Sequence, residues 1–268
     1  MFAGLSKAGA SLRFPPRDSL ASRLDAIIPN PIQPSLRVDR DLFQLFATAS
    51  VEMWQRAVHS FLISASLTRA SPIWSSVAGY YSSHYSIRAL AHLLGYFQLR
   101  RRHLTVKLDV AAKQLVCHVS RGKTREHQFY WETVEAEPPF SGDPLFTPNK
   151  EETESDARHR IAANYFDHVD NYPQFEVLDE AYLKARIEHI AAIEVLDPPI
   201  PRASHFPDLE NVQIVALHRL VRYRTFVDDS LGKSNRFWTS NRNPDWCPTY
   251  LPFNVNTSQA LPEIEQSR

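Results

Sequence analysis

Basic, imidazole and phenol side chains gather in one stretch of the chain, from Ser155 to Asp170, which reads SDARHRIAANYFDHVD. Arginine forms paired hydrogen bonds with phosphate oxygens, and histidine titrates near neutral pH. On an ideal helix Arg158, Ala162 and Tyr165 share one face, whereas positions 158 and 163 lie about 140° apart. The stretch therefore carries residue types that can bind a phosphate and transfer a proton.

The same stretch also has a purely structural interpretation. Glu154 and Arg158 have the i to i+4 spacing that stabilises a helix by about 0.3 kcal/mol. Under this interpretation Arg158, His159 and Arg160 are solvated side chains on an ordinary helix. The acidic residues that precede or adjoin them are Glu151, Glu152, Glu154 and Asp156.

A second stretch with chemical potential is the helix predicted from about Ile73 to Leu99, within which the segment from Trp74 to Gly95 reads WSSVAGYYSSHYSIRALAHLLG. Two stripes run along it at helical spacing. One stripe holds Tyr80, His84, Ile87, Ala91 and Leu94, and the other holds Tyr81, Tyr85, Arg88 and His92. Core packing explains the tyrosines, but an arginine and a histidine one turn apart on an inward face need polar partners.

Together the two stretches resemble the HEPN superfamily, the small helical domains of prokaryotic toxins, antiviral effectors and RNases. The earlier stretch is similar to the family's helix with paired tyrosines, small residues, an Ala-Leu pair and a glycine. The later stretch is similar to the catalytic segment, in which an arginine is followed after four to six residues by His, any residue and Tyr. Arg158 stands in the Arg place and Tyr165 in the Tyr place, but Ala163 stands in the His place.

The resemblance implies metal-independent RNA cleavage. The histidine would move a proton at the ribose 2′-hydroxyl or at the leaving oxygen, while the arginine stabilises charge on the phosphorane. It also implies a homodimer whose cleft gathers motif residues from both subunits, which agrees with the wide angle between positions 158 and 163. Further residues that would support such a site are His159, Asn164, His168, Arg88, His92, Tyr81 and Tyr85.

Ala163 cannot transfer a proton, and three explanations are open. The protein is a natural pseudoenzyme that kept the fold for binding or assembly; or His159 or His168 serves as a displaced base; or a His to Ala change was introduced to inactivate a toxic RNase. In the third case the string RHRIAANYF would have been RHRIAHNYF, which is a close match to the family.

Between the two family-like stretches the hydrophobic period changes from about 3.6 to 2. Residues 103–110, 114–120 and 125–134 are short runs rich in Val, Thr and aromatic residues, which predicts a three-stranded antiparallel meander inserted between helices. Basic residues cluster around this insertion, and a solvated hairpin explains them as well as a phosphate site does. The residues predicted to contact RNA are Arg101, Lys123 and, from the motif stretch, Arg160.

The whole chain is predicted to be mostly α-helical, a HEPN-like bundle with this small β insertion. Further helices are expected at 19–28, from Asp39 to a break near Ser71-Pro72, at 178–196 and at 209–231. The predicted segments are an N-terminal arm (1–38), HEPN-like helices (39–100), the β insertion (101–137), HEPN-like helices with the motif (138–232) and an irregular tail (233–268).

Composition limits the classes of partner. The 30 basic and 30 acidic residues cancel, so any RNA contact must come from a local patch. Cys117 and Cys247 have no metal-ligand spacing, the seven glycines form no phosphate loop, and no apolar run has the length of a membrane span. We therefore expect a soluble cytoplasmic protein without metal or cofactor.

Two functions follow as expectations. The first is an RNA-targeting effector or toxin of a bacterial defence or toxin–antitoxin system, with a cognate antitoxin or defence protein as partner. The second is a catalytically dead HEPN-like scaffold that binds and regulates a partner protein. A positively charged cleft around Arg158 favours the first function, and a neutral or apolar surface there favours the second.

Overall fold

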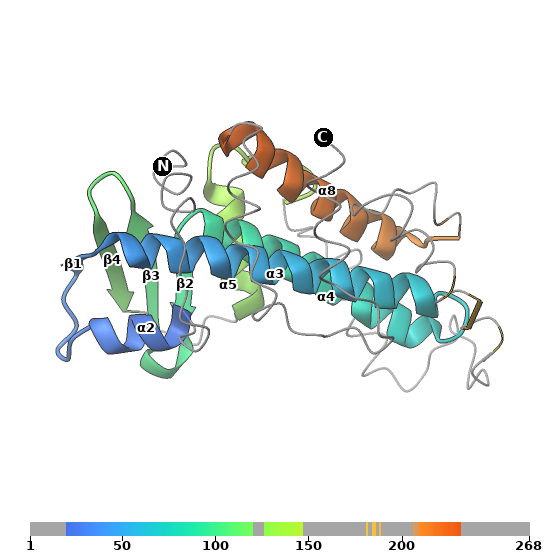
Figure 1. Cartoon of the computed structure of the whole chain (residues 1–268), viewed down its shortest axis with the longest axis horizontal. Coiled ribbons are helices and arrows are strands. Elements are labelled where there is room, and N and C mark those ends of the chain that lie inside the picture. The colour runs from blue at the N-terminus through green and yellow to red at the C-terminus, as the bar shows by residue number, and fades with distance from the viewer. Residues whose placement is uncertain are drawn as a thin grey trace. The chain divides into compact units, whose positions relative to one another are not determined.

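A computed structural model of the chain describes residues 20–119, 126–146 and 208–231, together with Ala181, Lys184, Ala185, Glu188 and Phe206. Within these residues five α-helices accompany one four-stranded antiparallel sheet (Figure 1). The helices are α2 (Leu20–Ile27), α3 (Arg40–Leu67), α4 (Pro72–Leu93), α5 (Glu126–Ala136) and α8 (Asn211–Leu231). The mostly helical prediction with an antiparallel β element is therefore confirmed at this level.

The sheet has the strand order β1-β4-β3-β2. Its strands are β1 (Ser35–Arg37), β2 (Tyr96–Leu99), β3 (Leu104–Asp109) and β4 (Gln114–Val119), and a 3-10 turn, η1 (Arg100–Arg102), joins β2 to β3. Alternate residues of β3 are buried, as the period of 2 predicts for a strand with one face on a core. The expected strands over 103–110 and 114–120 are confirmed as β3 and β4.

Three predictions about the secondary structure are wrong. The run 125–134, expected as the third strand, is helix α5, and Tyr130 and Val134 are its buried residues at i and i+4. The helix expected to reach Leu99 ends at Leu93, and Tyr96–Leu99 turns back as strand β2. Residues 35–37, expected within an irregular arm, form β1 and pair with β4. The sheet accordingly has four strands rather than three.

The described residues fall into two compact units, and the boundaries between them lie within helices α3, α4 and α8. The first unit holds α2, the sheet, α5 and the parts of α3, α4 and α8 that belong to Met1–Met53, Ile87–Thr147 and Tyr223–Trp246. Within it the Ser50 hydroxyl donates to the Ala89 carbonyl oxygen at 2.6 Å, and the Phe140 and Phe226 rings pack with centroids 4.7 Å apart. Burial raises the pKa of Tyr223, whose hydroxyl lies 2.7 Å from that of Ser50.

The second unit contains the remaining parts of α3, α4 and α8, including residues 54–86. Small residues let its helices approach closely. The Ser82 hydroxyl donates to the Ala57 carbonyl oxygen across the α3–α4 contact at 2.8 Å. At Gly79 an added Cβ would lie 3.1 Å from the Ser64 hydroxyl and 3.4 Å from Val212. The small residues of α4 therefore permit a close neighbouring helix.

Other helical predictions agree where they can be compared. Helix α2 matches the short helix expected at 19–28, and α8 matches the one expected at 209–231. In the range 178–196, the four described positions are all helical and exposed. Within the described ranges, no helix combines the length and apolar character needed to cross a bilayer.

Candidate functional site

The motif stretch lies outside the described residues. This applies to Arg158, His159, Arg160, Ala163, Asn164, Tyr165 and His168, and also to Lys123. The predicted site residues that the structure places are Tyr81, Tyr85, Arg88, His92 and Arg101. They fall into three groups.

Arg88 and His92 come together around Tyr130, in the first unit. Both residues lie near the end of α4, one turn apart, and Tyr130 comes from α5. The His92 ring meets Tyr130 edge-on at a centroid distance of 5.5 Å and stacks on Phe97 of β2 at 5.1 Å. The Arg88 guanidinium carbon lies 5.3 Å from the centre of the Tyr130 ring, in cation–π geometry. Three elements thus converge on one aromatic cluster.

His92 is a neutral, structural histidine in this arrangement. It is only 1% exposed, and its Nδ1 donates to the Tyr96 carbonyl oxygen at 3.0 Å, since a carbonyl can only accept. Burial, helped by the positive charge of Arg88 and opposed by the Tyr96 hydrogen bond, lowers the pKa of His92 to about 3. An imidazole that is shielded from solvent and has so low a pKa is poorly suited to act as a general base at neutral pH.

Tyr81 and Tyr85 belong to an aromatic ladder of α4 within the second unit. The two half-buried rings lie 6.0 Å apart, and Tyr81 also meets the buried Tyr80 ring edge-on at 5.4 Å. His84 stacks parallel to Tyr80 with a centroid distance of 6.4 Å. These contacts are packing contacts along one helix. They agree with the interpretation that the tyrosines of the two stripes serve core packing.

Arg101 lies exposed in the turn η1, between Arg100 and Arg102. Its neighbour Arg102 donates to the carbonyl oxygens of Ile28 at 2.7 Å and Pro29 at 2.9 Å, just past the end of α2. A cation at this position satisfies backbone acceptors and complements the negative end of the helix dipole. Arg102 is therefore a structural residue, and no local sequence pattern indicates this role.

A polar triad on the sheet was also missed by sequence reasoning. The Lys107 ammonium and the Tyr96 hydroxyl both donate to one oxygen of Glu137, at 3.0 Å and 2.6 Å. Burial, together with the hydrogen bond to Glu137, raises the pKa of Tyr96. The Lys107 ammonium also lies 4.6 Å from the centre of the Tyr96 ring. Tyr96 and Lys107 are cross-strand partners, so this triad fixes β2, β3 and the end of α5 together.

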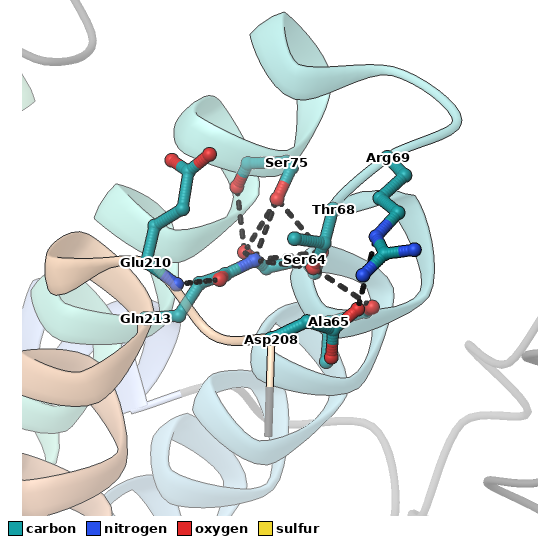
Figure 2. Close-up of polar contacts among 8 residues, drawn as sticks. All are labelled: Ser64, Ala65, Thr68, Arg69, Ser75, Asp208, Glu210 and Gln213. Carbon is teal, nitrogen blue, oxygen red and sulfur yellow. Dashed lines mark hydrogen bonds and ion pairs between the residues drawn. The ribbon is translucent and has the colours of Figure 1, made fainter. Parts of the chain in front are cut away.

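A dense hydrogen-bonded cluster, the Gln213 cluster, lies in the second unit and is formed by Ser64 and Thr68 of α3, Ser75 of α4 and Gln213 of α8 (Figure 2). The amide nitrogen of Gln213 lies 2.6 Å from the Ser75 hydroxyl, 3.0 Å from that of Thr68 and 3.0 Å from the Ser64 carbonyl oxygen. Its amide oxygen accepts from the Glu210 backbone N–H at 2.7 Å, which fixes the orientation of the amide.

The Gln213 cluster has no group suited to acid–base or nucleophilic chemistry. Serine and threonine hydroxyls need an adjacent base for activation, and a glutamine amide does not titrate. Gln213 itself is fully buried. Because an unmade hydrogen bond in such a place costs about 1–3 kcal/mol, the cluster acts as a polar anchor for α8 on the α3–α4 hairpin.

Metal chemistry has no support from the described residues, among which no group of three or more His, Cys, Asp or Glu side chains comes together. Cys117 is buried on strand β4, and burial raises the pKa of its thiol. A raised thiol pKa disfavours the reactive thiolate.

The placed residues form structural clusters in α4 and one exposed basic turn. Comparison of the chain with family models, curated proteins and solved structures finds no match.

Proposed function

We propose that the protein is a HEPN-like, RNA-targeting effector or toxin of a bacterial defence or toxin–antitoxin system, whose endoribonuclease centre lacks its base at Ala163. The observation that supports this proposal most is the helical hairpin of α3 and α4. Helix α4 carries the first family-like segment, and its serines allow close helix contact, as Ser82 on the Ala57 carbonyl oxygen shows. A close-packed pair of helices agrees with the helical bundle that the resemblance implies.

The described part of α4 narrows the proposed chemistry. His92 is buried and neutral, so it is not a candidate for the catalytic base, and the Arg88 guanidinium packs on the Tyr130 ring. The proposed roles therefore rest on the motif stretch. Arg158 would hold the phosphate and stabilise the negative charge of the phosphorane, with Tyr165 on the same helical face. A base at position 163 would take the proton of the ribose 2′-hydroxyl while the 2′-oxygen attacks phosphorus. The bond from phosphorus to the 5′-oxygen would break, and the 5′-oxygen would take up a proton from the protonated base or from water. Such a mechanism needs no metal.

The second candidate is a non-catalytic HEPN-like scaffold that binds and regulates a partner protein, such as a cognate antitoxin or another defence protein. It is favoured by Ala163 itself and by the structural use of Arg88 and His92. The two candidates share the same fold and differ in whether restoration of the base creates an activity.

Restoration of the base tests the proposal. We expect the Ala163→His variant to cut tRNA and total RNA in the presence of a chelator, while the unchanged chain does not. The matched control is the Ala163→His, Arg158→Ala double variant, which should be inactive because the phosphate loses its arginine. If Ala163→His folds, as judged by circular dichroism, and leaves both RNAs intact, the enzyme proposal is wrong and the scaffold is favoured.

The displaced-base alternative has a separate outcome. If the unchanged chain cuts RNA, His159→Ala and His168→Ala should identify which imidazole replaces the missing one. A His92→Gln variant serves as the buried-histidine control, and its activity should equal that of the unchanged chain.

A further inference from the structure

The turn η1 presents consecutive arginines at one end of the sheet. It joins β2 to β3, and the strand register places the end of β4 beside it, because Leu104 pairs with both Leu99 and Val119. Arg100, Arg101 and His103 are exposed, and so are His118 and Val119 at the same end. We name Arg100–His103 the basic turn.

The basic turn is held in place by hydrogen bonds of its backbone and of Arg102. Its backbone closes through a hydrogen bond from the His103 N–H to the Arg100 carbonyl oxygen at 3.2 Å, with His103 in the left-handed conformation at φ 48°. Arg102 ties it to α2 through the carbonyl oxygens of Ile28 and Pro29. Because Arg102 is committed to α2, the neighbouring exposed arginine presents its guanidinium from a fixed backbone. Fixed donors lose less entropy on binding.

Positively charged residues predominate in the sequence around the basic turn. Between Ile87 and Leu108 the chain has no aspartate or glutamate. The same interval holds five basic residues: the consecutive Arg100, Arg101 and Arg102 of the turn, Arg88, which packs on Tyr130, and Lys107, which pairs with Glu137. Among the residues described for α2, the one acidic side chain is Asp25, and it pairs with Arg102 at 3.7 Å. Three consecutive arginines therefore concentrate positive charge at this turn of a chain whose net charge is zero.

We propose that the basic turn is a docking site for the phosphate backbone of single-stranded RNA, separate in sequence from the motif stretch. This inference rests on the proposed RNA-directed function. An anionic polymer fits the turn better than a protein partner does, because a stable protein interface needs an apolar centre. Val119 is the one large exposed hydrophobic residue described at this end. Phosphate contacts need only cations and carry no sequence preference.

RNA binding by single-charge variants tests the proposal. The probe is a fluorescein-labelled single-stranded RNA of about 20 nucleotides, titrated with the unchanged full chain, which retains Ala163, at about 50 mM and about 200 mM salt. Arg101→Ala should weaken binding about three- to tenfold at the lower salt and reduce the salt slope by about 0.7, the value of one phosphate contact on a single strand.

Arg37→Ala is the matched control. Arg37 is also an exposed arginine on the sheet, but it pairs with Gln114, at the opposite end of β4 from His118 and Val119. Its removal should change affinity less than twofold. The proposal is overturned if Arg101→Ala binds like the unchanged chain, or if both variants weaken binding equally. It is also overturned if poly-glutamate competes as strongly as RNA at equal charge.

Failure of this inference can be told apart from failure of the proposed function. If Ala163→His cuts RNA and the added Arg101→Ala change leaves KM unaltered, the docking site is wrong while the nuclease stands. If Ala163→His is inactive but Arg101→Ala still weakens RNA binding selectively, the docking site stands and the nuclease is wrong.

Discussion

At the scale of single residues, the structure shows that side chains of a type suited to catalysis can be used entirely for packing. Arginine and histidine one turn apart on α4 are the types that a phosphate site uses, and the sequence correctly required partners for them if they were buried. The partners are the Tyr130 ring and the Tyr96 carbonyl oxygen. Which partners they find was not predictable, because Tyr130 was assigned to a strand and Tyr96 to a helix.

The pH dependence of stability should report the buried state of His92. Its pKa is about 3 in the folded chain and near 6.5 when unfolded, so the unfolded state binds the extra proton as pH falls below about 6.5. Stability from this residue is therefore complete above that pH and is lost as the pH falls. Between about pH 7.5 and 5.5 the free energy of unfolding should drop by about 1 kcal/mol more in the unchanged chain than in His92→Gln.

Urea titrations of both proteins at the two pH values measure this difference. Glutamine is a suitable replacement because it can still donate to the Tyr96 carbonyl oxygen and does not titrate. Equal pH dependence of the two proteins would show that His92 is accessible to protons in the folded state.

At the scale of elements, the change from helix α4 to strand β2 depends on Gly95. This residue has φ +88°, and its N–H donates to the His92 carbonyl oxygen at 3.0 Å. Its own carbonyl oxygen accepts from the Leu108 N–H at 2.8 Å. A glycine with positive φ just past a helix is a stop signal. The apolar pattern that continues through Tyr96–Leu99 hid this signal, which is why the helix was extended too far.

Substitution of two glycines should separate the energetic cost of a left-handed backbone from the cost of a steric clash of the new Cβ. Gly95→Ala places a Cβ 2.8 Å from the Leu108 carbonyl oxygen, whereas the Cβ of Gly142→Ala, at φ +79°, meets nothing within 4 Å. Left-handed backbone costs about 1–2 kcal/mol for alanine at either position. We expect Gly142→Ala to lose about 1 kcal/mol of stability and Gly95→Ala about 3 kcal/mol.

Denaturant unfolding of the two variants checks this expectation. If both lose the same free energy, the backbone of β3 yields to the new methyl group at no cost, and the close approach at Leu108 is not a constraint.

Helix α5 shows a different limit of prediction at this scale. Its aromatic and β-branched residues favour a strand by local propensity, but burial of Tyr130 and Val134 follows the helical period. The Gln128 amide also donates to Glu132 at 2.7 Å, one turn later. Strand β1 could not be predicted from its sequence, since three residues are too few for a periodic pattern.

At the scale of the whole molecule, composition and hydrophobic period correctly indicated a helical protein with an antiparallel sheet. Polar contacts between residues far apart in the sequence could not be predicted. Ser64 and Gln213 are 149 positions apart, and nothing in either local sequence connects them. The catalytic part of the predicted site remains a prediction, because residues 158–168 lie outside the described part of the chain.

Self-association is the prediction that belongs to this scale. On one ideal helix positions 158 and 163 point about 140° apart, so a single motif stretch cannot aim both at one phosphate. We therefore expect a homodimer, with a mass by light scattering of about twice the 30.7 kDa of the chain. A monomer at micromolar concentrations, with Ala163→His nevertheless active, would show that one chain completes the site.

The Gln213 cluster also selects a single alignment for helix α8. A slide of α8 by one residue would turn the Gln213 side chain by about 100° and move it about 1.5 Å along the axis. The hydroxyls of Ser64, Thr68 and Ser75 would then face the apolar side chain of Val212 or Ile214 in place of the amide. Apolar contacts alone tolerate such slides, whereas misplaced buried polar groups do not. The cluster therefore specifies one register of α8, because it destabilises the alternative registers.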